Sequence, residues 1–205
     1  FNVRIVDGPS VGFTFSGSNP VIGRPSASES RLDVRVLEQA LASQGAVVID
    51  TGSTGPDVGN IIIDTPIFYQ GRGLARLSLN AANDIFVNQP ITAAAGPLDL
   101  DFNADFDANG SGKVILGSDL ITLGGTVTFQ EDVVTTGNAG LSILSGGGDI
   151  IFAGNLRLDN PDGLDLSSQG GDILMASLSA STQRNAILRL TDLGQRNLYT
   201  SISAL

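Results

Sequence analysis

Apolar residues recur along this chain in short runs of three, and one polar residue precedes each run. This first motif reads NIII from Asn60, DIFV from Asp84, KVIL from Lys113, DVVT from Asp132, DIIF from Asp149 and DILM from Asp172. The starting points are 24, 29, 19, 17 and 23 residues apart, about 22 on average. A recurring spacing of this size indicates a repeat architecture in which each unit packs on its neighbours.

A second motif follows each of these runs and alternates between apolar and polar residues. It reads LSL from Leu77, LDL from Leu98, VTF from Val127, LSI from Leu141, LDL from Leu164 and LRL from Leu188. Such alternation is typical of a strand with one face in the core and the other in water. Turn-forming sequences such as NPDG at Asn160 and QGG at Gln169 separate the motifs.

Two short strands in each unit, without a helical pattern between them, predict a right-handed parallel β-helix of about six coils over residues 46–205. A βαβ sheet would need crossover helices, and the sequence offers none. Equivalent strands would then stack about 4.8 Å apart. The competing interpretation is a β-sandwich, in which Ile61, Ile85, Val114 and Ile150 would be scattered among antiparallel hairpins.

The first 45 residues differ from the repeats, and we expect them to form a cap over the first coil. The stretch SESRLDVRVLEQALASQG predicts the chain's one good helix, with Ser30 as N-cap, Asp33 in the capping-box position and Gly45 as the residue that ends it. Its apolar residues are Leu32, Val36, Leu37, Ala40 and Leu41. Two alternating stretches, FNVRIV and VGFTF, precede it.

The middle residues of the first motif predict an apolar column on the outside of the coils. If the residues on either side point inward, the column consists of Ile62, Phe86, Ile115, Val134, Ile151 and Leu174. Contiguous apolar surface of this kind is normally covered. We expect the N-terminal helix either to lie on the column or to close the first coil; a neighbouring chain is the alternative cover.

Composition narrows the classes of function. Acidic residues outnumber basic ones 21 to 11, which gives a net charge of −10 and disfavours nucleic acid and anionic membrane surfaces as partners. The chain contains no histidine and no cysteine, so the commonest general base and metal ligand is missing, as are disulfides. Because no apolar run approaches about 18 residues, no membrane insertion is expected. We expect the chain to be either a mature protein or a piece of a longer one, and we favour the second interpretation.

An aspartate-rich stretch is the one candidate metal site. The sequence DLDFNADFDANGSG places Asp101, Asn103, Asp105, Asp107 and Asn109 at alternate positions, and DFDANG resembles the start of a calcium-binding loop. Leu116 stands where an EF-hand would have its bidentate glutamate, which excludes an EF-hand proper. A turn whose Asp and Asn side chains bind their own backbone is the favoured interpretation of the stretch, and a calcium site is the alternative.

An enzymatic interpretation is weaker. Some parallel β-helix proteins are polysaccharide lyases or hydrolases that use carboxylates and Ca²⁺ on an outer face. Asp99 and Asp165 occupy the same motif position but lie three units apart, and no neighbouring basic column accompanies them. We therefore expect no catalytic residues and no enzyme. Phe68 and Tyr69 are a candidate sugar-stacking pair, for which packing in the core or at a corner is the simpler explanation.

The chain from about Leu37 to Gln169 resembles the interior of filamentous haemagglutinin-type exoproteins, large adhesins that Gram-negative bacteria secrete by the two-partner route. The resemblance rests on LEQALASQGAVVIDTG, GNIIIDTPI, LARLSLNAANDIFVNQPITA and GLDLSSQGGDI, and it covers about two-thirds of the chain. It implies a secreted segment of an extracellular surface fibre. We expect the N-terminal secretion module of that family to lie outside this segment.

These observations together predict a structural or adhesive segment of a bacterial surface fibre that presents side chains and loops to a host or matrix glycan or receptor. Its partners would be neighbouring segments of the fibre or identical subunits. One alternative is a self-assembling filament subunit joined end to end or by an exchanged N-terminal strand. A second alternative is a calcium-dependent polysaccharide-binding or lyase β-helix.

Overall fold

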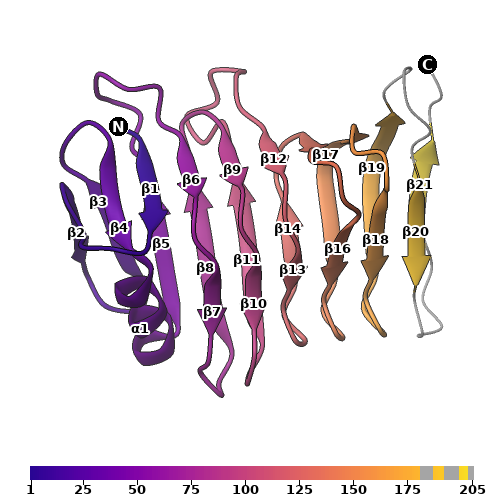
Figure 1. Ribbon diagram of the computed structural model, residues 1–205, viewed down its shortest axis with the longest axis horizontal. Coiled ribbons are helices and arrows are strands. Elements are labelled where there is room, and N and C mark those ends of the chain that lie inside the picture. The colour runs from indigo at the N-terminus through magenta and orange to yellow at the C-terminus, as the bar shows by residue number, and fades with distance from the viewer. Residues whose placement is uncertain (181–186, 192–198, 203–205) are drawn as a thin grey trace.

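A computed structural model of the chain describes residues 1–180, 187–191 and 199–202. Short strands, nearly all parallel, stack along one axis from the N-terminal end, where the helix lies, to the C-terminal end (Figure 1). The molecule is a parallel β-solenoid, and each complete turn contains three strands, one on each of three faces. The prediction of a parallel β-helix is confirmed, and the antiparallel sandwich is excluded.

The first face begins with an antiparallel strand pair and continues with parallel strands. In spatial order its strands are β2 (Phe13–Ser16), β3 (Val21–Pro25), β5 (Ala46–Asp50), β8 (Ala75–Asn80), β11 (Leu98–Asn103), β14 (Val127–Phe129), the start of β17 (Ile150–Leu158) and the start of β19 (Ile173–Ala180). The strand β21 (Tyr199–Ile202) pairs with β19. The solenoid therefore has about eight turns, where the sequence predicted about six coils.

The second and third faces carry the other strands of each turn. The second face contains, in spatial order, β4 (Ser30–Asp33), β1 (Val3–Val6), β6 (Ile61–Ile63), β9 (Ile85–Val87), β12 (Val114–Leu116), β15 (Val133–Thr135) and the ends of β17 and β19. The third face contains β7 (Ile67–Tyr69), β10 (Ile91–Ala93), β13 (Leu120–Ile121), β16 (Leu141–Leu144), β18 (Leu164–Ser167) and β20 (Leu188–Thr191).

The sequence motifs are real strands, but they change face along the chain. Ile61, Ile85 and Val114 stack on the second face as predicted, whereas Ile150 stacks on Val127 of the first face. The second motif likewise lies on the first face in its first three copies and on the third face in its last three. The change falls at the predicted unit of only 17 residues, because that unit spans two strands of a turn instead of three.

Inward side chains form continuous ladders along the axis. One ladder on the first face contains three fully buried phenylalanines, Phe102, Phe129 and Phe152. Their ring centroids are 4.9 and 4.8 Å apart with interplanar angles of 12° and 10°. This spacing equals the distance between neighbouring strands, so parallel stacking of identical side chains follows directly from the in-register coils.

Asp and Asn side chains connect the coils at their corners. The Oδ1 atom of Asn60 accepts a hydrogen bond from the backbone N–H of Asp84 at 3.1 Å, and Oδ1 of Asp84 accepts one from the N–H of Lys113 at 3.0 Å. Asp149 does the same for the N–H of Asp172 at 2.8 Å. Each side chain caps the residue at the equivalent position one turn further on. This bond explains why an acidic or amide residue introduces most copies of the first motif.

The helix α1 (Val34–Gln44) closes the N-terminal end of the solenoid at the third face. Val34, Leu37 and Leu41 are buried against the first turn, and the Glu38 carboxylate accepts the exposed edge N–H of Phe68 on β7 at 2.7 Å. The helix contacts β4, β5, β7 and β8, so it caps the coil and does not cover the predicted apolar column. A helix is about 10 Å wide, which equals about two strand spacings. On the third face α1 therefore takes the place of two strands, at the level where the first face has β2 and β3 and the second face has β4 and β1.

The helix boundaries correct one detail of the sequence analysis. Asp33, rather than Ser30, is the N-cap: its Oδ1 accepts the N–H of Arg35 at 3.0 Å. Ser30 lies in β4, where its hydroxyl donates to the carbonyl of Ala27 at 2.6 Å. Gly45 ends the helix with a left-handed φ of 75°, as predicted. Val36 is 42% exposed and does not belong to the buried side of the helix.

Candidate functional site on the first face

An open groove of about 230 Å³ runs across the outer surface of the first face. Its lining comes from the neighbouring strands β8, β11 and β14 and from the residues just before and after β14, and comprises Arg76, Asp99, Leu100, Asp101, Thr126, Thr128 and Gln130. Each polar residue is placed by the alternation of its strand, because inward neighbours such as Leu77 and Leu100 are buried in the core. The strand register then brings these outward residues side by side.

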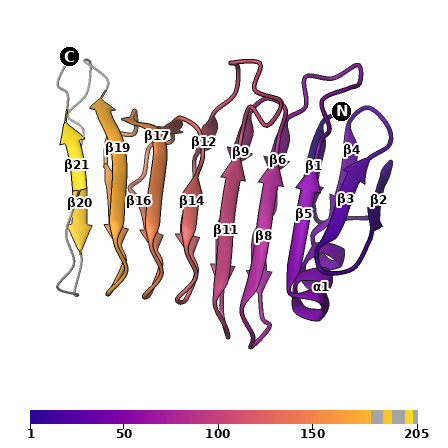
Figure 2. The ribbon, with the colours of Figure 1, turned by 180° about the vertical axis from the view of Figure 1, so that it is seen from behind.

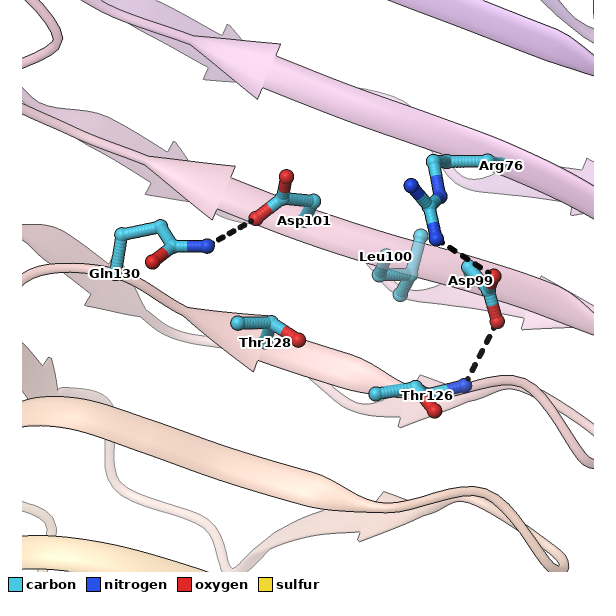
Figure 3. Close-up of a pocket in the computed structure, with 7 residues that line it drawn as sticks. All are labelled: Arg76, Asp99, Leu100, Asp101, Thr126, Thr128 and Gln130. Carbon is cyan, nitrogen blue, oxygen red and sulfur yellow. Dashed lines mark hydrogen bonds and ion pairs between the residues drawn. The ribbon is translucent and has the colours of Figure 1, made fainter.

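Hydrogen bonds connect the groove residues across the strands (Figure 3). The guanidinium of Arg76 lies 3.3 Å from Oδ2 of Asp99, its register partner. The other carboxylate oxygen of Asp99 accepts the backbone N–H of Thr126 at 3.0 Å. Further along, the Gln130 amide donates to Oδ1 of Asp101 at 3.0 Å. The second carboxylate oxygen of Asp101 and the Thr128 hydroxyl remain for an external polar ligand.

The groove carries two carboxylates at alternate outward positions of one strand. Asp99 and Asp101 alternate on one strand, about 6.6 Å apart, a spacing set by strand geometry. Both oxygens of Asp99 and one oxygen of Asp101 already accept internal hydrogen bonds. Arg76 is the basic neighbour that the sequence analysis did not find. Aligning ARLSLN with LDLDFN, the register seen between β8 and β11, would have placed Arg76 beside Asp99.

The five predicted metal ligands divide between one strand and the loop that follows it. Asp101 and Asn103 lie on β11, while Asp105, Asp107 and Asn109 belong to the loop that follows it. The Asp105 carboxylate accepts the N–H of Gly110 at 3.0 Å, and Asn109 Oδ1 accepts the N–H of Ser111 at 3.0 Å. Within the described ranges no group of three or more acidic side chains is arranged to hold a metal ion. The turn interpretation accounts for these contacts, and calcium binding by this stretch stays a prediction.

Glu131 follows the groove strand and lies near this loop. Burial raises the pKa of the Glu131 carboxyl, and the negative charges of Asp105 and Asp132 raise it further. The group therefore favours its neutral form more than an ordinary glutamate does.

The predicted apolar column divides between two faces. Ile62, Phe86, Ile115 and Val134 stack on the second face, each half-buried, and Arg4 and Arg157 continue the row at its two ends. Ile151 and Leu174 pair with each other and with Thr128 on the first face, beyond the groove. The single six-residue column was wrong because the motif changes face after Val134.

The candidate sugar-stacking pair is also separated. Tyr69 is only 2% exposed, and its hydroxyl donates to the carbonyl of Gly73 at 2.6 Å; burial raises the pKa of this phenol. Phe68 points the other way and is 45% exposed. Successive residues of a strand face opposite sides, so the two rings cannot form one platform.

Comparison with family models, curated proteins and solved structures found no match for this chain. In the described part of the chain, no helix is both long and apolar enough to span a bilayer. The fold and the groove together define a parallel β-solenoid repeat protein with a capping helix, in which strands of the first face carry polar side chains on their outer side.

Proposed function

We propose that the chain is a structural and adhesive segment of an extracellular bacterial surface fibre, and that the groove on the first face binds a glycan. The solenoid holds its outer side chains at fixed spacings along a rigid axis. The groove is the observation that carries the proposal, because it gathers guanidinium, carboxylate, hydroxyl and amide groups on an open surface.

The chemistry of the groove favours a polyhydroxylated ligand. A sugar hydroxyl can donate to the free oxygen of Asp101 and accept from the Thr128 hydroxyl on the neighbouring strand. Arg76 is 62% exposed in its side chain and can donate to a second sugar while it remains near Asp99. The open, flat shape predicts weak binding at each site, so several copies in a fibre would act through avidity.

The structural part of the proposal rests on the side-chain contacts that join each turn of the solenoid to the next. Corner carboxylates connect successive turns, and the core is a continuous apolar ladder from the first turn to Met175. Such nearest-neighbour contacts support an extended rod. The sequence resemblance to large adhesins points in the same direction.

A glycan array with the labelled full chain tests the groove, followed by affinity measurement on each hit. Thr128→Arg places a long side chain in the groove and should reduce binding at least tenfold. Thr92→Arg is the matched control, because Thr92 is also the outward middle residue of a three-residue strand but lies on the third face. Equal loss with both variants, or no bound glycan, would contradict the proposed binding site.

A further inference from the structure

The strand β1 occupies an unusual position in the solenoid. It lies between β4 and β6 and is parallel to both, although its register partners on β4 and β6 are 27 and 58 residues further along the chain (Figure 2). Its partners in register are Arg31 and Ile62 on either side of Arg4. On the first face, by contrast, β3 pairs directly with β5. The chain therefore inserts its N-terminal strand into a slot left open by the later turns.

The slot is built to hold a strand. Val3 and Ile5 are fully buried, and the N–H of Val3 donates to the Asn60 carbonyl at 2.8 Å while the Asn2 carbonyl accepts from Ser30 at 3.1 Å. Outside, Arg4 forms an ion pair with Asp64. Without β1, both edges of the slot would expose unpaired backbone groups and apolar side chains, so some strand must fill it.

A short link, residues 7–10, joins β1 to the segment that follows it. Residues 7–10 cross over β4, and Val11 then forms two hydrogen bonds with Arg31 on the opposite edge of β4, at 2.9 and 2.8 Å. Asp7, Pro9 and Ser10 in this link are exposed. Residues of β1, and not those of the link, form the contacts with β4 and β6. A β1 strand from another copy can therefore form the same contacts.

We propose that the slot between β4 and β6 accepts β1 from a second copy of this chain, so that copies associate by strand exchange. Exchange of an identical element creates an intermolecular interface without new contacts. The linked strand competes at an effective concentration in about the millimolar range, so exchange is expected when copies refold together at comparable concentration. This inference goes beyond the proposed function and does not depend on the groove.

Single cysteines provide the test, because the natural chain has none. Arg4 and Ile62 are outward register partners on neighbouring strands about 4.8 Å apart, within the range for a disulfide. Arg4→Cys and Ile62→Cys chains are denatured together, refolded together at high concentration and oxidised. The expected product is a disulfide-linked heterodimer on non-reducing gels, several-fold above the yield for Arg4→Cys mixed with Thr128→Cys, whose cysteine lies on another face.

The double variant carrying both Arg4→Cys and Ile62→Cys, refolded when dilute, is expected to form the same disulfide within one chain. If that internal bond forms but the mixture gives no more heterodimer than the Thr128→Cys control, strand exchange is wrong. If the internal bond does not form in a folded chain, the slot itself is wrong. Circular dichroism on each variant confirms the β fold, and glycan binding by the dilute monomer tests the groove separately.

Discussion

The stacked phenylalanines predict how stability is distributed along the solenoid. Phe129 has an aromatic neighbour on both sides, whereas Phe102 has one, with Leu79 in the next turn on its other side. All three rings of the stack are buried. Replacing the middle ring should therefore destabilise the protein more than replacing the ring at the end, although both substitutions remove the same atoms.

The expected magnitudes follow from burial and from the ring contacts. A buried phenylalanine removes about 200 Å² from water, so Phe129→Ala should lower the free energy of unfolding by about 3–5 kcal/mol. Each parallel ring contact contributes about 0.5–1.5 kcal/mol beyond burial. Phe102→Ala loses one such contact instead of two, so it should cost less than Phe129→Ala by about that amount.

Chemical denaturation followed by circular dichroism measures these differences, since the chain has no tryptophan for fluorescence. Thr128→Ala, whose side chain points outward from the same strand, is the control and should change stability by less than about 0.5 kcal/mol. Equal losses for Phe102→Ala and Phe129→Ala would refute the stacking argument. A loss below about 1 kcal/mol for Phe129→Ala would contradict its placement in the core.

Four further predictions follow from individual contacts. Asp149→Ala removes the acceptor for the Asp172 N–H and should cost about 1–2 kcal/mol in denaturant unfolding, whereas exposed Asp162→Ala should be nearly neutral. Gly45→Ala should cost about 1 kcal/mol through its positive φ alone, because an added Cβ has room, while Gly73→Ala should cost almost nothing. Because the folded pKa of Glu131 is raised, its contribution to stability is present below about pH 4.5 and is lost as pH rises through the raised value; Glu131→Gln should therefore flatten the difference in unfolding free energy between pH 4 and pH 7. Calcium should produce no titration heat and no shift in Tm, since Asp105 and Asn109 already bind loop N–H groups; a clear shift would restore the calcium site.

The sequence predicted the outward position of some groove residues but not the contacts between them. Alternation placed Asp99 and Asp101 on an outer strand surface, and this is confirmed. The ion pair with Arg76 and the hydrogen bond from Gln130 depend on register between strands that are 23 to 29 residues apart. Loops of unequal length separate those strands. The local pattern of apolar and polar residues does not show how many loop residues each coil of the solenoid contains, so it does not fix the register.

The sequence by itself determined that this protein is a stack of short parallel strands with one capping helix. Period-two alternation, glycine corners and the Asp or Asn before each apolar run are local signals, and each matches a strand or corner of the solenoid. Helix end signals at Gly45 were equally local. Such features can be predicted from the sequence because they depend on a residue and its immediate neighbours.

Only the tertiary structure decided which strands share a face. The motifs around Val133 and Ile150 look alike, yet one lies on the second face and the other on the first, because either strand can present alternate apolar residues to the same core. Strands of two or three residues on the third face carry too little pattern to be recognised alone. The insertion of β1 between β4 and β6 joins distant segments through backbone hydrogen bonds, which are available to every residue except proline and leave no mark in the sequence.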